Sequence, residues 1–219
     1  TRALKADARP MPDDLNVLVS PADGCISEHG IIDGQRLLQA KNRDYRLDEL
    51  LPVPPELWRP YMQGHFTTIY LAPKDYHRFH MPVTARLRST VYVPGQLYSV
   101  NNTTADSMQR LFARNERLVA FFDTPYGPIC MVMVGAMIVS GIKAYHHGLY
   151  RSKFNELVWD EAPADAQGAA LAFERGEVFG HFQLGSTVIV LTPPGMVTYQ
   201  ALKAGDVVRC RAGLGLINV

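Results

Sequence analysis

Three residues far apart in the chain are of the types that together activate a serine hydroxyl. Asp23 lies in "SPADG" after an apolar stretch, His80 ends "YHRFH", and Ser186 lies in "GHFQLGST" where an apolar run begins. A serine hydroxyl attacks only when a base takes its proton, and an aspartate often orients the imidazole that serves as the base. Each residue also has an ordinary structural reading, because Asp–Gly is a common turn pair and a serine in a core segment often has only a backbone partner. Chain order alone does not define a triad, since a triad is a geometry.

A second histidine, His77, lies three residues before His80. If this segment is helical, residues three apart share a face and both imidazoles approach one pocket, with Asp75 near enough to orient either ring. The segment has no HExxH arrangement and no third ligand follows it, which argues against a metal site. Imidazoles titrate near neutral pH and suit proton transfer. The adjacent His146 and His147 point in different directions and are interpreted as surface residues.

The segments that must position these side chains carry mostly strand patterns. Short runs rich in β-branched and aromatic residues, bounded by Gly, Pro, Asp or Asn, predict strands. These runs are "NVLVS", "TTIYLA", "ARLRSTVYV", "RLVAFFDT", "PICMVMVGAMIVSGI", "TVIVLT" and "DVVRCRAG". Helical patterns are few: one over 105–116, a short one at "RLDELL", and one turn near Leu171 and Phe173. The fold class expected is β-rich α+β, with antiparallel sheets or a barrel-like core and a few peripheral helices.

Composition sets further limits. The chain has 219 residues, 47% of them hydrophobic, which fits a single catalytic domain over 1–219. A net charge of +1 gives no indication of nucleic-acid binding. Cys25, Cys130 and Cys210 lie far apart, so we expect reduced, buried thiols and a reducing compartment. No stretch is long and apolar enough to cross a bilayer. The first residue is Thr1 rather than methionine, so we expect a further N-terminal segment before it.

Taken together, the motifs resemble one family. "SPADG", "YHRFHMP", "LFARNER", "FFDTPYGP" and "GHFQLGSTVIVL" occur in the order and context of phosphatidylserine decarboxylase proenzymes. The resemblance runs from the "SPADG" segment to the C-terminus. The "LGST" form is similar to the bacterial and mitochondrial type.

The resemblance implies that the chain cuts itself between Gly185 and Ser186. Residues 1–185 become a β chain, and residues 186–219 become an α chain that begins with a pyruvoyl group made from Ser186. Asp23, His80 and Ser186 are expected to act in this cleavage as a protease triad does. The glycine has no Cβ, so the backbone there can bend as attack on its carbonyl requires.

The mature enzyme is then expected to convert phosphatidylserine to phosphatidylethanolamine and CO2 with the covalent pyruvoyl cofactor and no metal. His77 resembles the family residue that handles protons during decarboxylation. The resemblance also implies a homodimer that lies peripherally on the cytoplasmic face of the bacterial inner membrane, with hydrophobic N-terminal helices contributing to binding. "PVPPELWRPYMQG" is an amphipathic candidate for membrane contact through Trp58, Tyr61 and Met62, although a loop packed on the core is the favoured reading.

Two other functions compete with this one. A serine hydrolase could use Asp23, His80 and Ser186 on an external substrate, but the sequence lacks the Gly-x-Ser-x-Gly elbow of α/β-hydrolases. A non-catalytic lipid- or protein-binding β domain could retain the motifs by descent, although the presence of all three residues gives this little support.

Overall fold

The computed structural model describes residues 3–5, 7–40, 43–136, 141–145, 148–150, 157–161, 170–183 and 186–219. Its largest element is a nine-stranded sheet in which β12, β7, β8, β9, β15, β5, β2 and β17 follow one another and β13 pairs with β7. The bounds are Gly24–Ile31 (β2), His65–Leu71 (β5), Ala85–Val93 (β7), Arg117–Thr124 (β8), Gly127–Gly135 (β9), Val158–Glu161 (β12), Ala172–Phe173 (β13), Ser186–Thr192 (β15) and Val207–Val208 (β17).

Three smaller sheets flank the large one. The first consists of Val17–Val19 (β1), Val197–Tyr199 (β16) and Gly213–Ile217 (β18). The second consists of Arg78–His80 (β6), Ile142–Ala144 (β10), Gly148–Tyr150 (β11) and Val178–Phe182 (β14). The third consists of Arg36–Ala40 (β3) and Arg43–Arg46 (β4). Every pairing between these named strands is antiparallel, which confirms the predicted fold class. The barrel-like alternative is wrong, because the large sheet ends at β12 on one side and β17 on the other.

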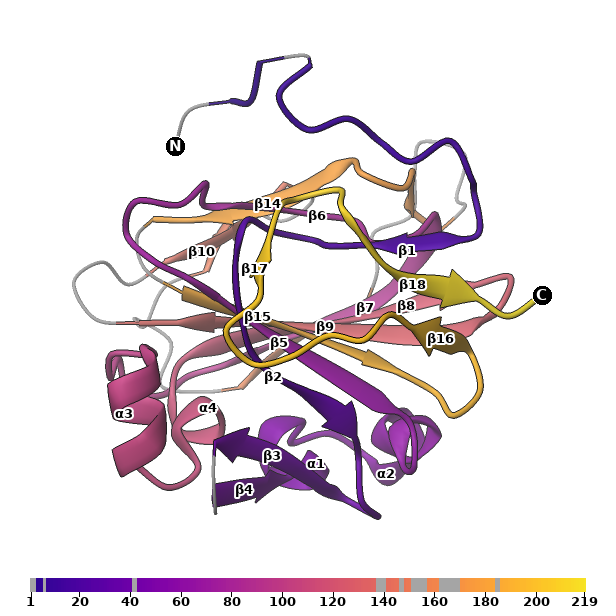
Figure 1. Cartoon of the computed structure of the whole chain (residues 1–219). Helices are drawn as coiled ribbons and strands as arrows, with labels where there is room; N and C mark the ends of the chain where they lie inside the picture. Colours follow the sequence, from indigo (N-terminus) through magenta and orange to yellow (C-terminus); the bar gives the residue numbers. More distant parts are fainter. Residues whose placement is uncertain are drawn as a thin grey trace.

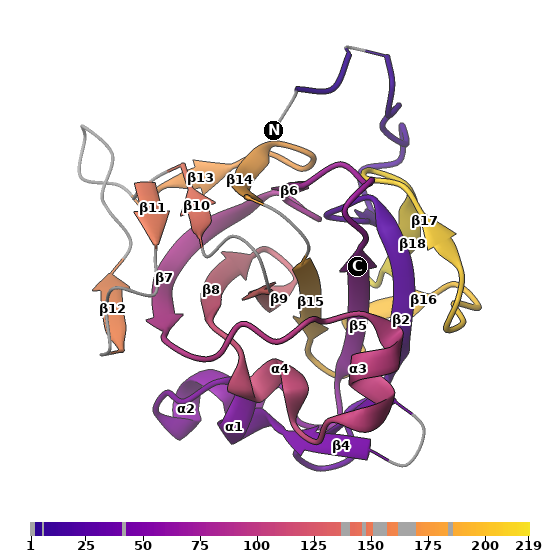
Figure 2. The same ribbon diagram turned by 90° about the vertical axis from the view of Figure 1, so that its left-hand side faces the viewer.

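Both faces of the large sheet are buried. Along β15, Val188 and Val190 belong to one hydrophobic cluster, and Ile189 and Leu191 belong to a second cluster on the opposite face. The sheet curves, and Figure 2 shows β6, β10 and β14 on one side of it and the helices on the other. Burial of both faces explains why "TVIVLT" is apolar at successive positions instead of alternating.

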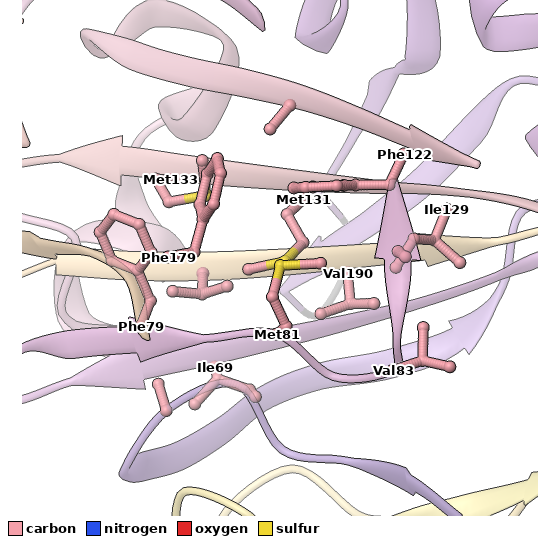
Figure 3. Packing of buried hydrophobic residues seen from close by; sticks show 14 of the residues in the cluster. Ile69, Phe79, Met81, Val83, Phe122, Ile129, Met131, Met133, Phe179 and Val190 are labelled. Carbon is pink, nitrogen blue, oxygen red and sulfur yellow. The ribbon is translucent and has the colours of Figure 1, made fainter. Parts of the chain in front are cut away.

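The first cluster holds the site in place. Phe79 on β6 and Phe179 on β14 pack against Phe122, Met131 and Met133 of the large sheet, as Figure 3 shows. Ring centroids of Phe122 and Phe179 lie 5.1 Å apart in an edge-to-face arrangement. This packing fixes β6, which carries His80, over the sheet that carries Ser186.

The helices are short and lie together below the large sheet in Figure 1. They are Leu47–Leu50 (α1), Pro55–Trp58 (α2), the 3-10 turn Arg59–Tyr61 (η1), Asn102–Ser107 (α3) and Leu111–Arg114 (α4). The helix predicted at "RLDELL" is confirmed as α1. The single helix predicted over 105–116 is wrong, because Arg110 adopts a left-handed conformation with φ 55° and separates α3 from α4. The helical turn predicted near Phe173 is also wrong, since Phe173 extends β13 and pairs with β7.

The segment considered for membrane contact is packed inward. Trp58 is 7% exposed and Tyr61 is 1% exposed, and both belong to the second hydrophobic cluster. Met62 packs against the same cluster. The reading as a segment packed on the core is therefore confirmed.

Candidate active site

Ser186 is the first residue of β15 and lies at one end of the large sheet. It pairs with Leu71 of β5 on one side and with Gly135 of β9 on the other. The residue is fully buried, and its Oγ has no hydrogen-bond partner in the described part of the chain. A buried hydroxyl without a partner loses its solvation without compensation, so its position calls for an explanation. Gly185 lies outside the described residues.

Asp23 lies in the turn between β1 and β2, and its carboxylate is surrounded by donors. Arg9 forms a two-point ion pair with it, the backbone N–H of Cys210 donates to Oδ1 at 2.8 Å, and Arg209 lies 3.4 Å from Oδ2. Burial acts to raise the pKa of the Asp23 carboxyl, but the bonds from Arg9 and Cys210 outweigh it and hold the pKa below its ordinary value. Asp23 is therefore a charged carboxylate in the protein interior.

His80 ends β6 and is 1% exposed. Its Nδ1 lies 2.8 Å from the carbonyl oxygen of Gly176, and its Nε2 lies 2.9 Å from the hydroxyl of Tyr76. A carbonyl only accepts, so Nδ1 carries the proton and Nε2 is left with its lone pair. Burial lowers the pKa of His80, and the charges of Arg211 and Arg78 act in the same direction. The hydrogen bond to Gly176 and, as the smallest contribution, the charge of Asp23 act to raise it. The imidazole is thus a neutral base at physiological pH.

The hydrogen bond expected between Asp23 and His80 is not among the contacts of the described residues. Gly176 takes the orienting place at Nδ1, and Asp23 acts on the ring through its charge. The two segments are nevertheless adjacent, because the backbone N–H of His80 donates to Pro21 at 2.8 Å. Arg211 bonds to the same Gly176 oxygen at 3.1 Å.

His77 lies immediately before β6, which begins at Arg78. The histidine segment is extended rather than helical, so the expectation that both rings share a helical face is wrong. The Nδ1 of His77 bonds to the backbone carbonyl of Asp75 at 2.6 Å, whereas the Asp75 carboxylate accepts from Ala72 within the turn.

An open cavity of about 490 Å³ lies beside His77. Positive side chains from three separate segments reach it, together with the Asp23 carboxylate. Its lining residues are Ala3, Leu4, Arg9, Asp23, Lys74, Asp75, Tyr76, His77, Gln183 and Arg209. Ser186 and His80 are not among these lining residues. The backbone N–H of Phe182, whose neighbour Gln183 lines the cavity, donates to the carbonyl of His77 at 2.9 Å.

Several residues of this region were missed at the level of sequence. Arg9 and Arg209 flank Asp23 but lie in segments with no recognisable motif, so nothing in the sequence indicates them. Tyr76 is the first residue of "YHRFH", and its place in the motif was the available indication. Gly176 acts through its backbone and leaves no chemical signature in the sequence.

Other sequence-based expectations have mixed outcomes. Cys130 and Cys210 are buried and free, and Cys25 is half-buried and free. His146 and His147 lie outside the described residues. Among the helices that the structure describes, none has the length and apolar character needed to cross a bilayer.

Comparison with known proteins assigns the chain to a family. The model of the phosphatidylserine decarboxylase family matches residues 1–218. A phosphatidylserine decarboxylase proenzyme of Pseudomonas fluorescens is 49% identical over 99% of this chain and 75% of its own length. One of Alcanivorax borkumensis is 46% identical over 98% of this chain and 74% of its own length. The chain therefore belongs to the phosphatidylserine decarboxylase family.

Proposed function

We propose that this decarboxylase produces its cofactor from its own chain by cleavage between Gly185 and Ser186. As a member of its family, the protein catalyses the conversion of phosphatidylserine to phosphatidylethanolamine and CO2. The observation that carries the proposal is the Ser186 hydroxyl, which is fully buried at a strand end and has no partner among the described residues. A hydroxyl held without a partner remains available to attack the preceding carbonyl.

His80 is the base that takes the Ser186 proton. Its Nδ1–H is held by Gly176, so Nε2 is the basic nitrogen, and burial keeps the ring neutral. The Tyr76 hydroxyl bonds Nε2 in the structure, so this bond must open before Nε2 takes the Ser186 proton. In the proposed step, Oγ adds to the Gly185 carbonyl, the C–N bond breaks and the proton passes to the released amine. The product is an ester between the Gly185 carbonyl and Ser186 Oγ.

Asp23 stabilises the positive charge that His80 acquires in this step. Its carboxylate stays ionised because Arg9 and the Cys210 N–H bind it. The field of a buried charge acts over several ångströms where water is excluded. A direct hydrogen bond to the ring is therefore not required for this role.

The environment of residue 186 suits a pyruvoyl group. The group is uncharged, and residue 186 is enclosed by the apolar cluster that contains Leu71 and Val188. When present, the pyruvoyl carbonyl system serves as an electron sink for decarboxylation. The resulting chains would be 1–185 and 186–219.

His77 handles the proton of the decarboxylation step from its position on the cavity wall. The same cavity offers Lys74, Arg9 and Arg209 to the anionic head group of the substrate. Because that substrate is a bilayer lipid, we propose that the protein works peripherally at the cytoplasmic face of the inner membrane, as a homodimer of processed chains.

The serine hydrolase alternative receives no support from the comparisons, in which the relatives bear the name of the decarboxylase. A fluorophosphonate reagent distinguishes the two functions. A hydrolase retains a reactive Ser186 hydroxyl, whereas a processed decarboxylase has lost it.

The test is denaturing mass spectrometry of the purified wild-type protein and of Ser186→Ala. We expect the wild type to give two chains divided before residue 186, the smaller with a blocked N-terminus that borohydride reduces. The Ala variant should remain a single chain without decarboxylase activity. An undivided wild-type chain that still releases CO2 from phosphatidylserine would refute the proposal.

A further inference from the structure

Glu116 is a fully buried carboxyl group just before β8. Its Oε2 accepts a hydrogen bond from the Tyr92 hydroxyl at 2.9 Å. Its Oε1 has no partner within the described residues. The carboxyl thus has one oxygen that is hydrogen-bonded and one that has no hydrogen-bond partner among the described residues. A buried carboxyl oxygen without a partner is costly, so its position calls for an explanation.

The unused oxygen lies against Gly135. A Cβ built on this glycine would be 3.4 Å from Glu116 Oε1. The two residues are also joined through the backbone, because the N–H of Gly135 donates to the Glu116 carbonyl at 2.8 Å. The space that a side chain at position 135 would fill is therefore bordered by the carboxyl.

Ser186 borders the same space from the other side. Gly135 and Ser186 are directly opposite in the antiparallel pair β9–β15, so their side-chain positions project from the same face. Cβ positions in such pairs are about 4.5–5.5 Å apart. Glu116 and Ser186 therefore flank a residue that has no side chain to separate them.

The alternation of the neighbouring strands confirms that the two groups share this face. Met133 lies two residues before Gly135, and Val188 lies two residues after Ser186; both belong to the first hydrophobic cluster. Leu118, two residues after Glu116, belongs to it as well, as does Tyr92. Glu116 Oε1 and Ser186 Oγ, two buried oxygens without partners among the described residues, consequently lie on the same face of the sheet, at the strand ends.

We propose that Glu116 donates a hydrogen bond from its neutral carboxyl to Oγ of residue 186 as this atom leaves during cofactor formation. The inference rests on the proposed self-cleavage and adds a residue to its second stage. In that stage a base removes the Cα proton of residue 186, a Cα–Cβ double bond forms, and the Cβ–Oγ bond breaks. Oγ departs with the electron pair as part of the Gly185 carboxylate. Water then converts the dehydroalanine to the pyruvoyl group and ammonia.

A hydrogen bond is sufficient for this role, and full proton transfer is not needed. The leaving group is a carboxylate, which is already a stable anion, and a donor aimed at developing charge lowers the barrier without moving its proton. Burial raises the pKa of Glu116, which favours the neutral donor form, while the Tyr92 hydroxyl acts to lower it. Tyr92 also binds Oε2, which leaves Oε1 to face residue 186.

The experiment follows cleavage of the full chain after pulse-labelled cell-free synthesis, with hydroxylamine added at intervals. Hydroxylamine cuts an accumulated ester and leaves a hydroxamate on Gly185 and a free amine on Ser186, which mass spectrometry separates from the pyruvoyl product. Glu116→Ala should accumulate this ester and form the α chain about 10²-fold more slowly. Glu116→Gln should form it at near the wild-type rate, because its carbonyl accepts from Tyr92 and its NH2 still donates.

Tyr92→Phe is the matched control. It removes the hydrogen bond that orients Oε2 but leaves the carboxyl beside Gly135, so a donor role predicts a clearly smaller delay in cleavage than in Glu116→Ala. If Tyr92→Phe and Glu116→Ala slow cleavage equally, Glu116 serves only to hold Tyr92 and the inference is wrong. It is equally wrong if Glu116→Ala cleaves at the wild-type rate, or if Glu116→Gln, with a wild-type melting temperature, stops at the ester. A wild-type chain that never divides would instead count against the proposed function itself.

Discussion

The Nδ1 atom of His80 lies 2.8 Å from the carbonyl oxygen of Gly176, a residue 96 positions later in the chain. In serine proteases an aspartate occupies the corresponding place beside the imidazole. Here a backbone carbonyl selects the tautomer, and Asp23 contributes charge from a site where Arg9 and Cys210 hold it. In the proposed cleavage, orientation and charge stabilisation are therefore assigned to two different residues, and the two roles can be tested separately.

Replacement of Gly176 by alanine should slow self-cleavage. Gly176 has φ +79°, and an added Cβ would meet the terminal methyl of Met11, which can move aside, and lie 3.3 Å from Nε of Arg211. The Arg211 guanidinium also bonds the Gly176 carbonyl that holds His80, so its displacement should disturb that carbonyl. Gly195→Ala is the control, because Gly195 has φ +72° but nothing within 4 Å of an added Cβ. Both variants bear a similar backbone strain of roughly 1 kcal/mol. Division of the chain, measured by gel and mass, should be delayed only in Gly176→Ala; equal delay in both variants would contradict the orienting role.

Replacement of His77 by alanine should separate the two reactions of the protein. The chain should still divide before Ser186, because His80 is the proposed base for that step. Decarboxylation should fall by ~10²–10⁴, the range for loss of a proton-transfer group. The measurement is CO2 release from phosphatidylserine in detergent, normalised to the amount of processed α chain. His80→Ala is the comparison and should remain undivided; an undivided His77→Ala chain would show that the roles are assigned wrongly.

Loss of the Asp23 charge should reduce stability as well as cleavage. Asp23→Asn leaves Arg9 without its buried partner, and breaking a buried pair costs roughly 3–5 kcal/mol. Because the Arg9 side chain is 21% exposed, we expect the lower part of that range. Urea unfolding of undivided protein, with Ser186→Ala as the background in all samples, gives the difference. Asp44→Asn, which loses only an exposed ion pair with Arg36, should change the unfolding free energy by less than about 1 kcal/mol. Equal losses in the two variants would contradict the buried pair.

The stability of the fold should depend on the protonation of His65. Burial lowers the pKa of His65 and of the neighbouring His29, whose ring centroid lies 6.2 Å away. As pH falls below the ordinary histidine pKa of about 6.5, the unfolded chain binds protons that the folded chain refuses, so these groups make the folded state less stable in acid. Glu28 and Glu116 have raised pKa values and act in the opposite direction.

The contributions of Glu28 and Glu116 to the pH dependence of stability cancel when the wild-type protein is compared with His65→Gln, because both proteins contain these carboxyl groups. Between pH 7.5 and pH 5.5, wild-type protein should lose more unfolding free energy than the variant, both measured by urea unfolding on the Ser186→Ala background. Tyr199 also contacts both rings, but its pKa of about 12 keeps it neutral over this range. Identical pH dependences for the two proteins would show that His65 titrates normally in the folded state.

Much of the fold could be predicted from the sequence because the relevant signals are local. The β-branched and aromatic runs of β5, β7, β8, β9 and β15 predict strands wherever they pair, and "RLDELL" supplies a capping glutamate for its own short helix. The break between α3 and α4 could not be predicted, because Gln39 reaches in from β3 to bond both Met108 and the N–H of Leu111. That interaction joins residues about seventy positions apart.

The sequence by itself determined the family and the β-rich antiparallel architecture, and it predicted Asp23, His77, His80 and Ser186 as the residues with chemistry to perform. Only the tertiary structure decided their arrangement: that His80 lies on a strand rather than a helix, that Gly176 holds its ring, that Arg9 and Arg209 enclose Asp23, and that Glu116 borders Ser186 across a glycine. The physical reason is that residue type and local pattern limit which groups can react and which elements can form. Hydrogen-bond partners and buried neighbours, in contrast, come from segments far away in the chain and are set only when the strands pair and the core packs.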